Sequence, residues 1–252
     1  MRILHTSDLH GRVDILLNAL SCADFDLWLD TGDFFPNKTR GEEYIETVFQ
    51  KEWFEGTPEW ISAPGPGPKW SGAAPAITEL LKGRPAVCVG GNHDYVSLAA
   101  ILKAVGADAY EVTTKGIEAG GLKFAGFPHI PWIAGEWNNE IHDFRDLVDE
   151  TFRSNPDVLV THAPPAGILD VYHGESCGIE SLMSNLCYTE HKIQAHFFGH
   201  VHESGGSNLG VGTQLRHGLS LTPAPDSRIS NMLFANGAGH AIVHEIYNLY
   251  GR

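Results

Sequence analysis

The sequence is poor in cysteine and has no long apolar run. Four cysteines occur among 252 residues, without a C-x-x-C pair or the density of a disulfide framework, which favours reduced thiols in the cytoplasm. No stretch reaches the roughly 20 apolar residues that a membrane span needs. Polar residues interrupt the start of the chain, where a signal peptide would carry an apolar segment. We therefore expect a cytoplasmic protein that makes no use of a membrane.

Positive charge is scarce as well. The 17 lysines and arginines are outnumbered by 31 aspartates and glutamates, which gives a formal net charge of −14. Such a surface repels polyanions, so we do not expect an extended footprint on duplex nucleic acid. A small anionic substrate is compatible with this charge if positive charge is concentrated at one place, and bound metal ions are one source of it. Histidine, by contrast, is abundant, with 14 residues.

The order of strand and helix patterns along the chain predicts an α/β fold. Apolar runs predict strands at 2–7, 25–30, 85–90, 109–113, 122–126, 157–161, 194–198, 211–217 and 239–247. Helical spacing of apolar residues predicts helices at 13–20, 41–54, 73–82, 95–105, 141–153 and 178–187. Residues 56–75 carry five prolines and four glycines and predict a long excursion loop. With no repeat and no clear linker, we expect a single domain over residues 1–252.

Five of the predicted strands end in residues that can bind a metal. The groups are Asp8-Leu9-His10, Gly32-Asp33, Gly91-Asn92-His93-Asp94, Thr161-His162 and Gly199-His200-Val201-His202. In open α/β sheets, sites form beyond the carboxyl ends of the strands, where several loops converge. Glycine beside three of the groups permits tight turns and a close approach of the backbone. We therefore expect these groups to meet at one edge of the sheet structure.

The donor atoms in these groups indicate which metals the site would take. They comprise carboxylates, imidazoles and one amide oxygen but no thiolate, which favours Mn, Fe, Zn or Co over a structural zinc site. Along an extended segment, residues i and i+2 point the same way, so the D-x-H and H-x-H spacings suit chelation. Seven ligands exceed what one catalytic metal with an open position requires. They suit two divalent ions about 3.5–4 Å apart that share one carboxylate.

The order of these motifs resembles that of a known family. D-x-H, G-D, G-N-H-D, T-H and G-H-x-H, running from residue 8 to residue 202, are similar to the calcineurin-like metallophosphoesterase superfamily. Within it, the stretches GLKFAGFPHIPW (121–132) and VTHAPPAGILDVYHGESCG (160–178) resemble the class III cyclic-nucleotide phosphodiesterases and the related metallophosphoesterase-domain-containing proteins. The resemblance implies a four-layer αββα sandwich, in which helices flank two mixed β-sheets.

The resemblance also implies which residues hold the two metals. The implied ligands are Asp8, His10, Asp33 and His202 for one ion, and Asp33, Asn92, His162 and His200 for the other. Asp33 would bridge the pair. Some relatives lose the first histidine of the last motif, whereas this chain keeps His200, so a complete two-metal site is implied. Two such ions lower the pKa of a bridging water until hydroxide forms near neutral pH, and that hydroxide attacks phosphorus in line with the leaving group.

Four further residues are candidates for roles beside the metals. His93 follows the ligand Asn92 and is placed to give a proton or a hydrogen bond to the departing oxygen, and we expect Asp94 to orient it. His129, in a loop rich in Pro and Trp, is a candidate substrate contact. Phe34 is a candidate stacking surface for a base or aryl group. A simple loop histidine and a core aromatic are the alternative interpretations of these last two residues.

Together these features predict a metal-dependent hydrolase of small phosphoric esters, with phosphodiesters of small or cyclic nucleotides as the leading substrates. One alternative is a nuclease or a phosphomonoesterase, protein phosphatases included, because the opening MRILHTSDLHG is also similar to the recombination-repair nucleases of this superfamily. A second alternative is a binding module that keeps the metals but has lost activity. The sequence is compatible with a monomer and with a homodimer.

Overall fold

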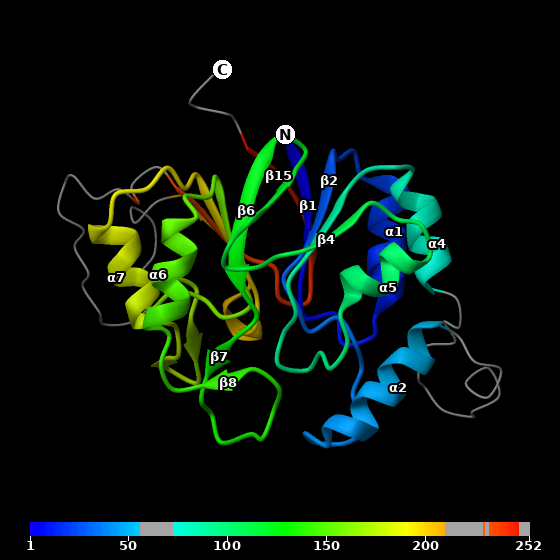
Figure 1. Ribbon diagram of the computed structural model, residues 1–252, viewed down its shortest axis with the longest axis horizontal. Helices are drawn as coiled ribbons and strands as arrows, with labels where there is room; N and C mark the ends of the chain where they lie inside the picture. The colour runs from blue at the N-terminus through cyan, green and yellow to red at the C-terminus, as the bar shows by residue number, and fades with distance from the viewer. Residues whose placement is uncertain (56–72, 210–228, 230–231, 247–252) are drawn as a thin grey trace.

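Two β-sheets lie face to face in the computed structural model, which describes residues 1–55, 73–209, 229 and 232–246 (Figure 1). The first sheet has the strand order β15-β1-β2-β3-β4. Its strands are Arg2–Thr6 (β1), Leu27–Asp30 (β2), Ala86–Cys88 (β3), Ala109–Glu111 (β4) and Ala241–Glu245 (β15). Strands β1 to β4 run parallel, and β15 pairs antiparallel with β1. The first sheet is therefore mixed.

The second sheet has the order β13-β14-β12-β9-β6-β5. Its strands are Ile117–Ala119 (β5), Leu122–Phe127 (β6), Val158–Thr161 (β9), Ala195–Phe198 (β12), Gly206–Leu209 (β13) and Leu233–Asn236 (β14). The four central strands are parallel and the two edge strands are antiparallel. Two short pairs lie outside the sheets: Ile130–Pro131 (β7) with Glu140–Ile141 (β8), and Val171–Tyr172 (β10) with Glu175–Ser176 (β11).

Helices cover the outer face of each sheet (Figure 1). On the side of the first sheet lie Val13–Cys22 (α1), Glu43–Glu55 (α2), Ala73–Leu81 (α4) and Leu98–Ala104 (α5). On the side of the second sheet lie Arg145–Arg153 (α6) and Glu180–Tyr188 (α7). A short 3-10 turn, His202–Ser204 (η1), follows β12. Among the described residues, no helix combines the length and apolar character that crossing a membrane requires.

The alternation of side chains along each strand explains the layers. Ile3 and Leu4 are adjacent in β1, and side chains at successive strand positions point to opposite faces. Ile3 belongs to the apolar cluster between the sheets, together with Phe197 of β12, whereas Leu4 packs with the helices outside the first sheet. A third cluster joins Leu159 of β9 to α6 and α7. These three apolar layers confirm the expected four-layer αββα sandwich of two mixed sheets.

Several predicted boundaries differ from the structure. The helix expected at 141–153 begins only at Arg145, because Glu140–Ile141 pairs with β7 instead. The predicted excursion loop ends earlier than residue 75, since α4 begins at Ala73 and a proline in the first helical turn needs no backbone N–H. The rest of that loop, 56–72, and the expected strand 211–217 lie outside the described residues. The single domain stays a prediction.

Candidate metal centre

The predicted metal-binding groups gather where strands of both sheets end. The segments after β1 and β2 run together, because the Asp8 amide donates to Gly32 O at 2.8 Å and the His10 amide to Asp33 O at 2.9 Å. The segment after β12 is tied to the one after β9 by the Gly199 amide, which donates to His162 O at 2.9 Å. The ring of His162 then bridges the two sheets, since its Nδ1 lies 2.7 Å from Thr31 O.

Four of the seven predicted ligands have a left-handed backbone. The φ angles are 54° at Asp8, 44° at His10, 55° at Asp33 and 69° at His200. For a residue with a Cβ, this conformation costs roughly 1–2 kcal/mol, so it persists only where the surroundings enforce it. Strained residues of this kind concentrate at functional sites. The strain in these strand-end turns therefore points to a site whose geometry matters more than local stability.

Two glycines allow the backbone to approach the predicted ligands. A Cβ on Gly91 would lie 2.2 Å from Asp33 Oδ1, and one on Gly199 would lie 2.3 Å from Asp8 Oδ2. Both distances are well inside van der Waals contact, so no other residue fits without moving a carboxylate. The close approach expected at these two positions is confirmed.

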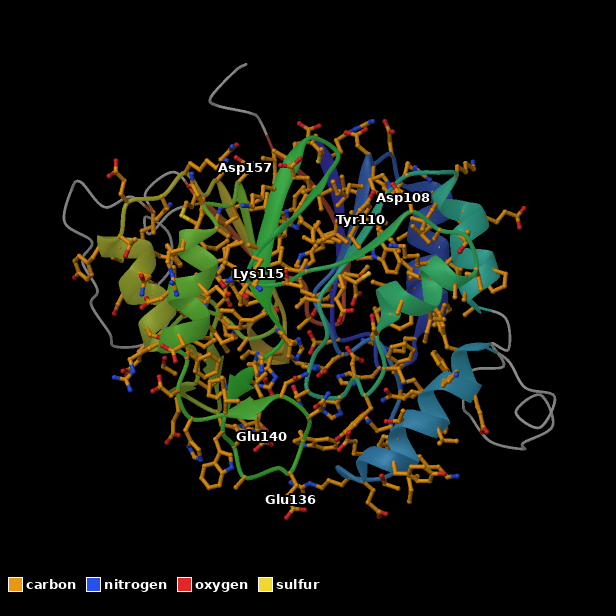
Figure 2. The ribbon with its side chains drawn as sticks, in the orientation of Figure 1. Asp108, Tyr110, Lys115, Glu136, Glu140 and Asp157 are labelled. Carbon is orange, nitrogen blue, oxygen red and sulfur yellow. The ribbon has the colours of Figure 1, made fainter. Side chains whose placement is uncertain are left out.

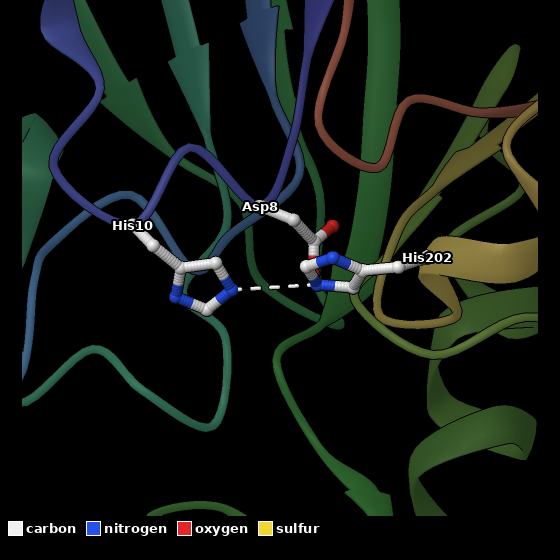
Figure 3. Close-up of side chains that lie close together, drawn as sticks. All are labelled: Asp8, His10 and His202. Atoms are coloured by element: carbon white, nitrogen blue, oxygen red, sulfur yellow. Dashed lines mark hydrogen bonds and ion pairs between the residues drawn. The ribbon is translucent and has the colours of Figure 1, made fainter.

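Acidic and imidazole groups converge in three overlapping sets. Within each set the donor atoms lie within 4.8 Å of one another; the sets are Asp8, His10 and His202, then His10, Asp33 and His93, then Asp33, His162 and His200. Figure 3 shows the first set, in which the rings of His10 and His202 meet tip to tip with 3.4 Å between their Nε2 atoms. Asp8 Oδ1 lies 3.2 Å from His202 Nε2, is buried and has no hydrogen-bond partner. Such a cluster of lone pairs fits a divalent cation.

Asp33 lies between two of these sets, which suits a shared ligand. Its Oδ2 lies 3.3 Å from His162 Nε2 and 3.9 Å from His10 Nε2. Asn92 joins the same cluster, because its Oδ1 lies 3.1 Å from His162 Nε2. The structure thus brings all seven predicted ligands together.

Charge in the cluster is balanced around Asp33. Burial alone would raise the pKa of Asp33, but the neighbouring ring of His162, together with other nearby histidines, outweighs it and lowers that pKa. Burial opposes a charge on His162, yet Asp33 and Asp8 raise its pKa to about 10. Burial and the charge on His162 lower the pKa of His200 to about 4. The buried carboxylate thus demands a positive partner, which is either the proton on His162 or a divalent cation that replaces it.

His93 stands at the edge of this cluster, with Nε2 3.9 Å from Asp33 Oδ2. The structure does not contain the expected contact in which Asp94 orients His93. The Asp94 carboxylate instead accepts three backbone N–H groups, from Asp33 at 2.8 Å, Phe35 at 3.1 Å and Gly91 at 2.9 Å. Asn37 is the partner of the His93 ring, with 2.6 Å between Oδ1 and Nδ1. Sequence reasoning missed Asn37, because it is a loop residue outside every motif.

The structure excludes one of the two predicted substrate contacts and leaves the other a prediction. Phe34 is fully buried and packs edge-on against Phe35 and Phe54, with ring centroids 5.2 and 5.5 Å apart. A stacking role for Phe34 is therefore wrong, and it is a core aromatic. His129 belongs to none of the three sets found among the described residues, and its buried Nδ1 has no hydrogen-bond partner. A substrate contact by His129 stays a prediction.

A match to a family model decides the family, and it covers most of the chain. A family model described as calcineurin-like phosphoesterase matches residues 1–204. This protein belongs to the calcineurin-like phosphoesterase family. The resemblance inferred from the motifs is thereby confirmed at the level of the family.

One curated relative and two solved structures give further context. The chain is 31% identical over 111 residues to the UPF0046 protein K07C11.7 of Caenorhabditis elegans; the match covers 39% of this chain and 36% of that protein. TT1561 of Thermus thermophilus aligns with a TM-score of 0.55 and 12% identity, covering 93% of this chain and 88% of that one. A second crystal structure aligns with a TM-score of 0.54 and 13% identity, covering 93% and 89%. At these identities the two structures speak for the fold alone.

Proposed function

We propose that this calcineurin-like phosphoesterase hydrolyses phosphodiesters of small nucleotides, cyclic ones included, with the help of two divalent cations. The observation that carries the proposal is the convergence of seven carboxylate, imidazole and amide donors around Asp33, the one carboxylate common to two of the sets. Such a donor set suits Mn, Fe, Zn or Co.

Each residue of the cluster has a distinct part in this proposal. One cation would be held by Asp8, His10 and His202, the other by Asn92, His162 and His200, and Asp33 would contact both. When bound, such a pair of cations supplies an activated water and stabilises the charge that develops on the phosphoryl oxygens.

The exposure of the cluster indicates where a substrate would approach. The side chain of His202 is 48% exposed and that of His10 30%, whereas His162 is fully buried. A phosphoester would therefore enter from the side of His10 and His202. His93 Nε2, on the rim of the same cluster, would hold the leaving oxygen by a hydrogen bond or give it a proton.

A small diester is favoured over the other substrates of the family on two grounds. The net charge of −14 opposes extended nucleic acid, and the stretches 121–132 and 160–178 resemble diester hydrolases. A nuclease of short ends and a phosphomonoesterase are the alternatives. A non-catalytic module is disfavoured, because this chain retains the complete donor set together with His93.

The test uses purified protein with each candidate metal. With Mn²⁺, we expect turnover of bis-p-nitrophenyl phosphate to exceed that of p-nitrophenyl phosphate. A preference for the monoester would favour the phosphomonoesterase. Metal binding without turnover of either ester would favour the binding module. Asn92→Ala and His200→Ala are expected to abolish turnover. A panel of 2′,3′- and 3′,5′-cyclic nucleotides, dinucleotides and single-stranded DNA would then identify the substrate class.

A further inference from the structure

We propose that Asn37 is a positioning residue for His93, which fixes both the tautomer and the direction of the ring so that Nε2 faces the reacting phosphoester. The inference rests on the proposed function for its consequence in catalysis, but not for its structural content. It begins with the 2.6 Å contact between Asn37 Oδ1 and His93 Nδ1. Neither residue type nor spacing in the sequence connects the two positions.

The neighbours of the Asn37 amide determine which way it points. Its Nδ2 lies 3.1 Å from His93 O and 3.2 Å from Glu46 Oε2. A carbonyl and a carboxylate only accept hydrogen bonds, so the NH₂ group must face them and Oδ1 must face the imidazole. Because an amide oxygen also only accepts, Nδ1 of His93 must carry a hydrogen. The atom that can gain or lose a proton is then Nε2, on the side of Asp33.

Helix α2 holds this amide in place through a buried carboxylate. Glu46 is fully buried and accepts, besides Asn37 Nδ2, the Lys38 amide at 2.9 Å, the Thr39 hydroxyl at 2.6 Å and the Thr39 amide. One turn further along α2, Gln50 donates to His93 O at 2.6 Å. Asn37 and the backbone of His93 therefore share one support, so the amide cannot flip without leaving buried acceptors unpaired.

Two further aromatic rings pack against the His93 ring. Trp137 packs on it with ring centroids 4.1 Å apart, and His10 meets it edge-on at 4.8 Å. Trp137 is fixed in turn by Glu140, whose Oε1 accepts the Trp137 amide at 3.1 Å. Glu140 is the first residue of β8, next to the loop that joins β7 to β8 (Figure 2). With Trp137 and His10 packed against the ring and Nδ1 bound, we place the substrate at the edge that carries Nε2.

A direct test reads the tautomer in protein freed of metal. Long-range ¹H–¹⁵N spectra of histidine-labelled protein distinguish a protonated from a bare ring nitrogen, and His93→Gln assigns the His93 signals. We expect neutral His93 to carry its hydrogen on Nδ1 in the wild type and to populate the other tautomer in Asn37→Ala. Thr39→Val, which alters the same Glu46 cluster without touching His93, should leave the signals as in the wild type. A wild-type ring protonated on Nε2 alone would overturn the proposal.

A kinetic test asks whether the tautomer matters for the leaving group. For aryl phosphodiesters with poor leaving groups, Asn37→Ala is expected to lower kcat about 10- to 100-fold with little change in KM. Good leaving groups need less help, so the loss should shrink with them. In a His93→Gln background Asn37→Ala should cost nothing further. Equal losses for all leaving groups, or losses that multiply in the double variant, would overturn the proposal. Absence of any turnover in the wild type would instead refute the proposed function and leave the tautomer measurement decisive.

Discussion

Histidines at the ends of strands and histidines inside strands serve different purposes in this protein. His162 and His200 follow β9 and β12, and their rings face carboxylates and one another. His5 in β1 and His196 in β12 are fully buried, and each has one ring nitrogen paired with a threonine hydroxyl, at 2.9 Å for His5 and 2.8 Å for His196. Burial with a hydroxyl partner therefore gives a neutral structural ring, whereas burial beside a carboxylate gives a cation or a metal ligand.

The two groups nevertheless touch the same segments of chain. His5 binds the hydroxyl of Thr31, whose carbonyl accepts a contact from His162 Nδ1. His196 binds the hydroxyl of Thr161, the residue before His162. The strand-interior histidines thus anchor Thr31, which directly follows β2, and Thr161, the last residue of β9, close to the predicted ligands that come next in the chain. Because the two groups of histidines have different roles, substitutions in them should separate a loss of catalytic activity from a loss of stability.

The largest effect is expected at the shared carboxylate. Asp33→Asn keeps the shape of the side chain but removes the charge that both cation sites would use. Turnover of bis-p-nitrophenyl phosphate should fall at least about a thousandfold, equivalent to about 4 kcal/mol in the activation barrier, with loss of metal by elemental analysis. His196→Phe, at a strand-interior position, should keep its metal and most of its activity. Undiminished turnover in Asp33→Asn would remove the basis for a two-cation site.

The strand-end site could be predicted from the sequence because each ligand follows an apolar run and lies beside a turn. Residues whose roles depend on the direction of a turn could not be predicted in this way. Phe34 directly follows Asp33, but the chain places its ring in the core beneath α2. Asn37 lies only four positions from Asp33 and has no motif, so its contact with His93 required the fold. The spacing of residues in the sequence shows which side chains are near one another along the chain. It does not show in which direction a left-handed turn points the side chain that follows.

The fold was predictable to a similar degree. The α/β class followed from the alternation of strands and helices, since the buried strands read as apolar runs, whereas the four αββα layers were implied by the resemblance to the family. The start of α6 and the short strands β5, β13 and β14 were not predicted. Their assignment depends on pairing with partners distant in sequence, such as Ser207 with Ala235. A strand of three or four residues carries too few side chains to reveal its own period.

Metal binding should stabilise the folded protein through the strand-end ligands and not through the strand-interior histidines. A cation present at about 100 times its Kd adds about 2.7 kcal/mol to the free energy of unfolding. We expect Mn²⁺ to raise the unfolding temperature of the wild type and of His196→Phe. His200→Ala should show a much smaller rise. The measurement is thermal unfolding with and without metal after treatment with a chelator, and equal rises in all three proteins would show that the ions bind elsewhere.

Two adjacent glycines offer a finer comparison of a strand end with the residue before it. A methyl group on Gly91 would lie 2.2 Å from Asp33 Oδ1, whereas one on Gly90 would meet only Pro128 Cβ at 3.7 Å. Gly91→Ala should therefore displace the shared carboxylate and lower turnover by up to about a hundredfold, the cost of a misplacement of about 1 Å. Gly90→Ala should stay near the wild-type rate. Similar rates in the two variants would mean that the position of Asp33 tolerates this shift.

The smallest effect expected, when it is counted per pH unit, is a pH dependence of stability that comes from a strand-interior histidine. Burial lowers the pKa of His196 to about 3, below its unfolded value of about 6.5. Between these two pKa values, His196 is protonated in the unfolded chain but not in the folded chain. The free energy of unfolding is therefore largest above pH 6.5 and falls as the pH decreases. The slope from this residue is at most about 1.4 kcal/mol per pH unit. In urea unfolding with a chelator present, His196→Phe should lose stability less steeply than the wild type between pH 6.5 and 4. Parallel curves would assign the acid sensitivity to the strand-end cluster and contradict a neutral, structural His196.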